Sequence, residues 1–212
     1  MRAFSLLLLG CASFASADSA DYRLIVGGKQ VGTVRTSLKF DKTGFFEEST
    51  AKVTQQGKTF SIFTKTQLDA NGNWVRKGIE MGSGTDLIKA FAVPKGKSAL
   101  VMMQRAGKKF QAEVPQASKL PTTDTTARWF LTYKPKPGEE AKFQRFDMQR
   151  RQWSDVSVRY VGPKTVTLGG KQVAGFEAER SEYGRKSSVI YDAKGMPILL
   201  DSPDMRLERI YR

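Results

Sequence analysis

The carboxylates of Glu177 and Glu179 have the spacing in this sequence that most resembles a catalytic arrangement. Residues two apart on a strand share a face, and two carboxylates on one face are what most glycosidases use. Arg180 follows them directly, however, and any solvent-exposed strand can carry such a pair. The remaining option is a lysine that acts with a serine or tyrosine, and no spacing in the chain indicates it. We therefore predict that the protein is not an enzyme.

Histidine and cysteine, which many catalytic and metal sites require, are almost absent from the sequence. The chain has no histidine, and its only cysteine is Cys11. These absences exclude a Ser-His-Asp triad, a Cys-His pair, an imidazole general base and a zinc site of the usual ligands. We expect no metal and no cofactor, and no disulfide within the chain after residue 17.

The charge balance favours anionic partners. The chain has 35 Lys and Arg residues against 21 Asp and Glu residues. Basic residues gather at three places, and aromatic residues accompany two of these clusters. The clusters are Arg105-Lys108-Lys109, Arg145-Arg150-Arg151 and Arg206-Arg209-Arg212. Behind an export signal, lipid headgroups or anionic polymers are more accessible than nucleic acid, so we expect no nucleic acid partner. The alternative is a solvated outer surface without a partner.

The N-terminus has the pattern of an export signal. Met1-Arg2 supplies a positive charge, residues 3–9 are apolar, and Ala15-Ser16-Ala17 is an A-x-A cleavage site. We expect a signal peptide over 1–17 and one domain over 18–212, either periplasmic or secreted. Leu8-Leu9-Gly10-Cys11 resembles a bacterial lipobox, so a lipoprotein anchored through acylated Cys11 is the alternative.

The rest of the chain alternates in the manner of antiparallel strands. Val156, Val158 and Tyr160 alternate with polar residues, and glycine turns separate this segment from the next ones. The pattern predicts an all-β protein, a single antiparallel meander of about 12–15 strands curled into a half-barrel, spiral or barrel. One irregular excursion is expected around 115–141, with one or two helical turns over 127–131.

One short motif occurs twice. The residues Gly-Gly-Lys-Gln-Val occupy 27–31 and again 169–173. The repeat is explained either by a duplicated β unit or by convergence on one hairpin turn. The flanking residues match only in hydrophobic character, which favours the turn.

Several of these pieces occur in a familiar order: the Gly-Gly-Lys-Gln-Val-Gly opening, Trp129-Phe130, Tyr160-Val161-Gly162, and the Asp192-Ala193-Lys194-Gly195-Met196-Pro197 turn. In this order the chain resembles uncharacterised bacterial envelope β-domain families. Some of those are thought to resemble the half-barrel lipoprotein carriers LolA and LolB. The resemblance implies a curved antiparallel sheet around an apolar cavity, and it implies no catalytic motif.

A curved sheet needs its inward face filled by side chains, a helix or a ligand. The expected ligand-binding residues are apolar positions of this face together with two aromatic residues of the excursion. They are Leu38, Phe40, Phe60, Ile62, Phe91, Met103, Trp129, Phe130, Val158 and Phe176. The function expected from them is non-covalent binding of a lipid or another amphipathic envelope component in an apolar trough. The alternative is a structural or adaptor protein with a filled core, which docks on another envelope protein or an anionic polymer.

Overall fold

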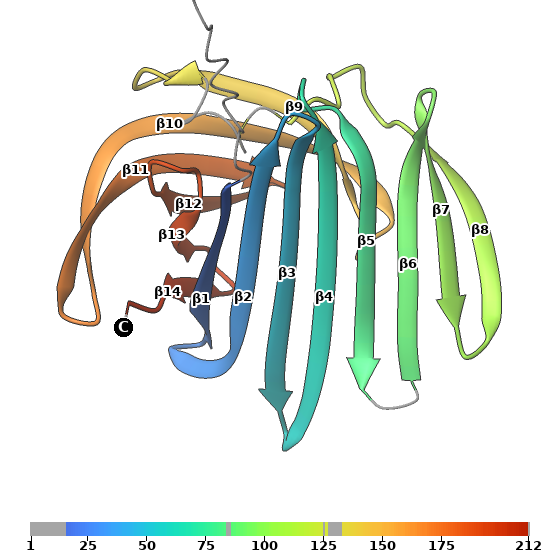
Figure 1. Cartoon of the computed structure of the whole chain (residues 1–212), viewed down its shortest axis with the longest axis horizontal. Coiled ribbons are helices and arrows are strands. Elements are labelled where there is room, and N and C mark those ends of the chain that lie inside the picture. Colours follow the sequence, from blue (N-terminus) through green and yellow to red (C-terminus); the bar gives the residue numbers. More distant parts are fainter. Residues whose placement is uncertain (1–15, 84–85, 125, 127–132, 212) are drawn as a thin grey trace, which may run out of the picture.

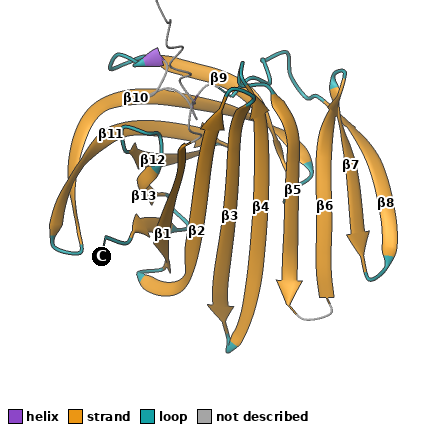
Figure 2. Ribbon diagram, viewed as in Figure 1, coloured by secondary structure: helices purple, strands orange, loops and turns teal. Residues whose placement is uncertain are grey.

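Fourteen strands form one antiparallel sheet in the computed structural model, which describes residues 16–83, 86–124, 126 and 133–211 (Figures 1 and 2). This confirms the predicted all-β meander. The first arm consists of β1 (Ser16–Val26), β2 (Lys29–Asp41), β3 (Gly44–Gln55), β4 (Lys58–Asp69), β5 (Trp74–Ser83), β6 (Asp86–Lys95), β7 (Ser98–Arg105) and β8 (Lys108–Pro115). The second arm consists of β9 (Glu140–Asp147), β10 (Gln152–Leu168), β11 (Lys171–Glu182), β12 (Arg185–Tyr191), β13 (Pro197–Asp201) and β14 (Arg206–Arg209).

The first and last strands meet in the interior of the sheet. The strand order is β8-β7-β6-β5-β4-β3-β2-β1-β14-β13-β12-β11-β10-β9, so β8 and β9 are its two edges. Tyr22 of β1 lies opposite Arg209 of β14, and Leu24 lies opposite Leu207. The sheet is therefore an open meander whose two arms join at the β1–β14 seam.

Two-residue glycine turns close most of the hairpins. Gly27-Gly28 and Gly169-Gly170 both have two positive φ angles, and each connects a pair of adjacent strands in the same way. Such turns match the right-handed twist of the flanking strands. The repeated Gly-Gly-Lys-Gln-Val motif therefore forms the same hairpin turn at both places.

The two arms fold onto each other. Trp74 of β5 lies with its ring 6.1 Å from that of Phe146 on β9 and 5.7 Å from that of Trp153 on β10. Leu68 and Val101 belong to the same buried cluster. Figure 1 shows β9, β10 and β11 crossing behind β2–β5 at a steep angle. Strands distant in the sheet thus share one core, because the sheet curls until β9 and β10 cover part of the first arm.

Between β8 and β9 the described residues form turns and one isolated bridge, Asn73 to Thr123. Gln144 of β9 donates its backbone N–H to Pro121 of this segment (2.7 Å). The predicted helical turns over 127–131 lie outside the described residues. Within the part of the chain that the structure describes, no helix is long and apolar enough to span a bilayer.

Candidate ligand-binding groove

We call the face of the first arm that carries Leu38, Phe45 and Leu68 the inner face, because it packs against β9 and β10. Four of the predicted ligand-binding residues are part of the core. Leu38 is buried in the cluster around Trp74, and Phe40 packs against that cluster. The other two belong to a second cluster on β9–β11, where Val158 is buried and Phe176 packs on it.

Three other predicted residues lie on the inner face with partial exposure. Phe60 and Ile62 have the same strand parity as buried Leu68, and Phe60 remains 39% exposed. Met103 has the parity of buried Val101. The structure thus places these three side chains on one apolar surface that it leaves partly open.

The sequence-based assignment of Phe91 to the inward face is wrong. Its neighbours Ala90 and Ala92 are both buried, so Phe91 points to the opposite face, which we call the outer face. The register places Phe91 between Gly78 and Met102 there. The remaining two predicted residues, Trp129 and Phe130, lie outside the described residues.

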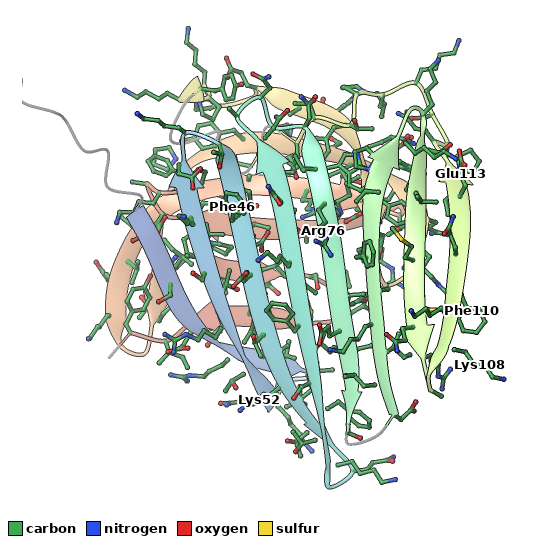
Figure 3. The ribbon with its side chains drawn as sticks, turned by 45° about the vertical axis from the view of Figure 1, so that its right-hand side comes forward. Phe46, Lys52, Arg76, Lys108, Phe110 and Glu113 are labelled. Carbon is green, nitrogen blue, oxygen red and sulfur yellow. The ribbon has the colours of Figure 1, made fainter. Side chains whose placement is uncertain are left out.

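The outer face of β3–β8 carries a groove of about 860 Å³. This volume is within the range of roughly 300–1,000 Å³ that is typical of small-molecule sites. Four apolar side chains of different strands contribute to it: Phe46, Phe63, Phe91 and Met102. Figure 3 labels Phe46 of β3 and, near it on the same face, Arg76 of β5.

The groove exists because one strand lacks a side chain in its middle. The cross-strand row on this face runs from Lys65 through Gly78, Phe91 and Met102 to Gln111. A Cβ atom built at Gly78 would meet only the backbone oxygen of Ala90, at 3.8 Å. Gly78 therefore leaves a gap on β5 between the larger side chains of Lys65 on β4 and Phe91 on β6.

Basic residues surround the apolar part of the groove. The charged lining residues are Lys65, Arg76, Lys89 and Lys109, against Glu80. Lys65 pairs with Glu48 at 2.6 Å, and Lys89 pairs with Glu80 at 3.1 Å. The guanidinium of Arg76 lies 4.7 Å from the centre of the Phe91 ring. Neither Arg76 nor Lys109 has an acidic partner within 4.0 Å among the described residues, so both cations are available to a bound anion.

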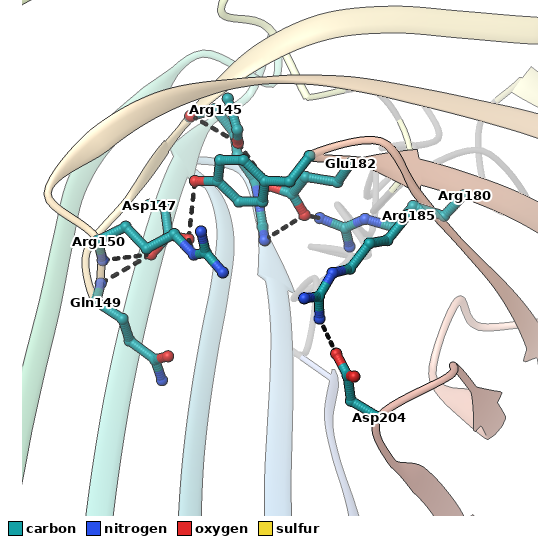
Figure 4. A network of polar contacts seen from close by, with 10 residues as sticks. Arg145, Asp147, Gln149, Arg150, Arg180, Glu182, Arg185 and Asp204 are labelled. Atoms are coloured by element: carbon teal, nitrogen blue, oxygen red, sulfur yellow. Dashed lines mark hydrogen bonds and ion pairs between the residues drawn. The ribbon is translucent and has the colours of Figure 1, made fainter.

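A polar cluster lies on the face of β9–β11 that carries buried Val156 and Val158. Arg145 donates to both carboxylate oxygens of Glu182, at 2.8 and 2.7 Å, and Arg180 donates at 2.9 Å (Figure 4). Ser154 donates its hydroxyl to the same carboxylate. Burial alone would raise the pKa of Glu182, but the two arginines and these hydrogen bonds lower it to about 2. Glu182 is therefore ionised at all ordinary pH values.

Two further ionisable side chains lie nearby. Burial lowers the pKa of Lys77 to about 8, helped by the positive charge of Arg145. Its ammonium group donates to the backbone oxygen of Phe146 at 3.2 Å, which ties β5 to β9. Burial, together with the charge of Asp124, raises the pKa of Glu47. Lys77 and Glu47 of the first arm thus lie within electrostatic reach of Arg145 and Arg180 of the second arm.

Glu177 and Glu179, the two glutamates with catalytic spacing, lie on the opposite face of β11 and are bound by neighbouring side chains. Glu177 accepts from Ser188 at 2.9 Å and pairs with Lys164, and Glu179 pairs with Arg159 at 2.6 Å. No three His, Cys, Asp or Glu side chains gather to hold a metal ion in the described part of the chain.

The basic clusters do not form continuous unpaired patches. Arg145 is bound to Glu182, while Arg150 stacks over Tyr183 with its guanidinium 4.4 Å from the ring centre. In the C-terminal cluster, Arg206 pairs with Glu208 and Arg209 pairs with Asp192, both at 2.8 Å. These four arginines thus contact partners within the fold, whereas Lys109 of the first cluster has no acidic partner among the described residues.

Of the residues that line the outer groove, the sequence prediction included Phe91 and Met103 and missed the rest, because it placed the ligand on the inward face. One signal in the sequence does indicate them. Ile62-Phe63 and Val101-Met102-Met103 are consecutive apolar residues within strands that otherwise alternate. A strand that is apolar at successive positions has apolar side chains on both faces of its sheet.

Comparison with known proteins supports the fold. No family model matches the chain, and no curated protein sequence matches it. The structure is similar to the crystal structure of a β-barrel-like protein of DUF1849, a domain of unknown function, from Brucella abortus. The TM-score is 0.58 with 12% sequence identity, over 91% of this chain and 94% of that chain. The crystal structure of a DUF1089 family protein from Pseudomonas aeruginosa also matches, with a TM-score of 0.45 and 13% identity over 96% of this chain and 97% of that chain. This likeness is too weak to support a conclusion about the fold. The resemblance to uncharacterised β-domain families thus holds at the level of the fold.

Proposed function

We propose that the protein is an exported envelope protein that binds an amphipathic lipid with an anionic headgroup, non-covalently, in the outer groove. The observation that carries the proposal is an apolar hollow beside two cations, Arg76 and Lys109, that have no acidic partner in the described part of the chain. Apolar burial of an acyl chain contributes about 0.8 kcal/mol per CH₂ group. Arg76 and Lys109 supply the charge that such a headgroup requires.

The ligand class is the one expected from the sequence, but the proposed site lies on the outer face and not on the inward face. The inner face is largely occupied where β9 and β10 cover it, whereas the groove lies on the outer face. Export is part of the proposal and rests on the pattern of residues 1–17. We also propose that the protein is related to the lipoprotein carriers LolA and LolB, on the basis of the sequence resemblance described above.

The test is a titration of the purified protein with a long-chain fatty acid that carries a fluorophore. Arg76→Gln is expected to weaken binding about fivefold, since a partly exposed ion pair contributes up to about 1 kcal/mol. Lys52→Gln is the matched control, because Lys52 lies on the outer face of β3 away from the groove (Figure 3). Gly78→Leu fills the groove and is expected to weaken binding more than Arg76→Gln does.

Equal effects of Arg76→Gln and Lys52→Gln, or undiminished binding by Gly78→Leu, would contradict this site. Native mass spectrometry of protein from its own host adds a second measurement. A co-purifying lipid is expected, and the mass of the polypeptide distinguishes a chain starting at Asp18 from one acylated at Cys11. A lipid-free protein that is recovered in a salt-sensitive complex with another envelope protein would instead support the adaptor alternative.

A further inference from the structure

Strand β8 is an open edge of the sheet. Among the strands that the structure describes, it pairs with β7 alone and ends the strand order, and Figures 1 and 3 show it at the margin of the molecule. Seven of its eight residues are exposed, and Val114 is half-buried. The other edge differs, since three of the eight residues of β9 are buried and the strand donates a backbone hydrogen bond to Pro121. An open edge offers unpaired backbone groups to another strand.

The β7–β8 turn determines which backbone groups are free. Ala106 and Gly107 have φ angles of 47° and 75°, as in a two-residue type I′ hairpin. In such a hairpin the residues that flank the turn, Arg105 and Lys108, form a hydrogen-bonded pair, and every second pair after them does too. The N–H and C=O groups of the intervening residues point away from β7. These residues are Lys109, Gln111 and Glu113, and among the described residues their edge groups have no partner.

The sequence of this edge is complementary to itself. An antiparallel copy centred on Gln111 places Lys109 opposite Glu113 of the second copy, and Glu113 opposite Lys109 of that copy. Six backbone hydrogen bonds then form, because each of the three residues contributes one donor and one acceptor on each side. On the inner face, half-exposed Phe110 lies opposite Ala112 of the second copy.

Other registers lack this match. Centring the pair on Lys109 brings two lysines together, and centring it between Gln111 and Ala112 leaves both charges without an opposite charge. A shift by one residue also turns the inner face of one copy to the outer face of the other. Registers centred on Phe110 or Ala112 keep the faces in place but pair Lys109 or Glu113 with Gln111. Only the register centred on Gln111 gives both charges an opposite charge.

We propose that two copies of this chain pair through β8 in antiparallel register around Gln111 and form a homodimer. Lys95 already holds Glu113 at 2.6 Å on the outer face, so the carboxylate is positioned for the second cation. The contact involves only one strand from each copy, so we expect the dimer to dissociate on dilution. In the dimer the outer faces of the two sheets are continuous. Lys109 is then paired with Glu113 of the second copy, so Arg76 is the groove cation that stays available to a headgroup in the dimer.

The experiment is sedimentation velocity of the purified chain over a wide concentration range. The wild type is expected to change from monomer to dimer. Lys109→Glu and Glu113→Lys each create two like-charge pairs and are expected to raise the dissociation constant at least about tenfold. The double variant Lys109→Glu/Glu113→Lys restores both opposite-charge pairs and is expected to recover wild-type dimerisation.

Lys108→Glu is the matched control, because Lys108 lies on the other face of β8 and opposite Val114 of the second copy. It is expected to change the dissociation constant less than about threefold. Gln111→Cys should form a disulfide-linked dimer under mild oxidation, since hydrogen-bonded antiparallel pairs have Cα atoms about 5.5 Å apart. A wild type that stays monomeric, or a double variant as weak as the single ones, would overturn the proposal. Lipid binding by a strictly monomeric protein would leave the proposed function standing.

Discussion

The carboxylate of Glu182 accepts hydrogen bonds from three side chains, one each on β9, β10 and β11. It accepts from Arg145, Arg180 and Ser154 and is 14% exposed. A buried ion pair of this kind adds little net stability compared with apolar packing, because both charges lose water. Removal of one member is different, since it leaves the other charges buried without a partner.

We therefore expect Glu182→Gln to lower the free energy of unfolding by about 3 kcal/mol at neutral pH. Glu179→Gln, which breaks only the exposed pair with Arg159, should cost less than about 1 kcal/mol. Chemical denaturation followed by tryptophan fluorescence measures both changes. Similar costs for the two variants would show that Glu182 is not a buried anchor.

The same carboxylate gives stability a defined pH dependence. Folding lowers the pKa of Glu182 from about 4.5 to about 2, so its contribution is complete above pH 4.5. The unfolded chain takes up this proton first as the pH falls, and the contribution is lost between those two values. The difference between wild type and Glu182→Gln should shrink over that range, and a constant difference would argue against the shift.

At the scale of elements, strands and turns could be predicted because their signals are local. The alternation around Val158 and the glycine pairs at 27–28 and 169–170 specify hairpins without knowledge of distant residues. The face of a strand was harder to predict where both faces are apolar. On β6, Phe91 and Val93 alternate with Ala90 and Ala92, so a period of two identifies no inward set.

The candidate groove could not be predicted for a related reason. It depends on Gly78 lying between Lys65 and Phe91, which are neighbours across strands and 13 residues away in either direction. Strand order is also non-local. Turns show that neighbouring segments pair, but they do not show that β1 pairs with β14 and leaves β8 at an edge.

The β2–β3 hairpin depends on one close backbone approach. Gly44 has a φ of +141°, and a Cβ atom there would lie 2.0 Å from the backbone oxygen of Leu68 on β4. We expect Gly44→Ala to cost at least about 3 kcal/mol of unfolding free energy. Gly57→Ala is the control, since Gly57 has a φ of +73° with open space around it, and it should cost about 1 kcal/mol. Thermal and chemical denaturation measure the loss of unfolding free energy in both variants. Equal losses would show that the close backbone approach at Gly44 is not important for stability.

At the scale of the whole molecule, stability depends on the seam where the chain's first and last strands pair. Tyr22 of β1 is buried and donates its hydroxyl to Pro197 of β13 at 2.9 Å. Arg209 of β14 donates to the same oxygen at 3.0 Å and to Asp192 at 2.8 Å. Burial raises the pKa of Tyr22 to about 12, so this hydroxyl remains a donor through the physiological range. The seam thus carries a connected set of hydrogen bonds between the arms.

Because the arms also share the core around Trp74 and Trp153, disruption of the seam should destabilise both arms together. Arg209→Leu removes a mostly buried cation and leaves Asp192 without its partner, so we expect a loss of about 2 kcal/mol in unfolding free energy. Arg206→Leu is the control, because the pairs of Arg206 are more exposed, and it should cost less than about 1 kcal/mol. Tryptophan fluorescence and far-ultraviolet circular dichroism should report one coincident transition for Arg209→Leu, since every strand belongs to one sheet. Two separated transitions would show instead that each arm keeps its structure after the seam opens, and the arms would then be independent folding units.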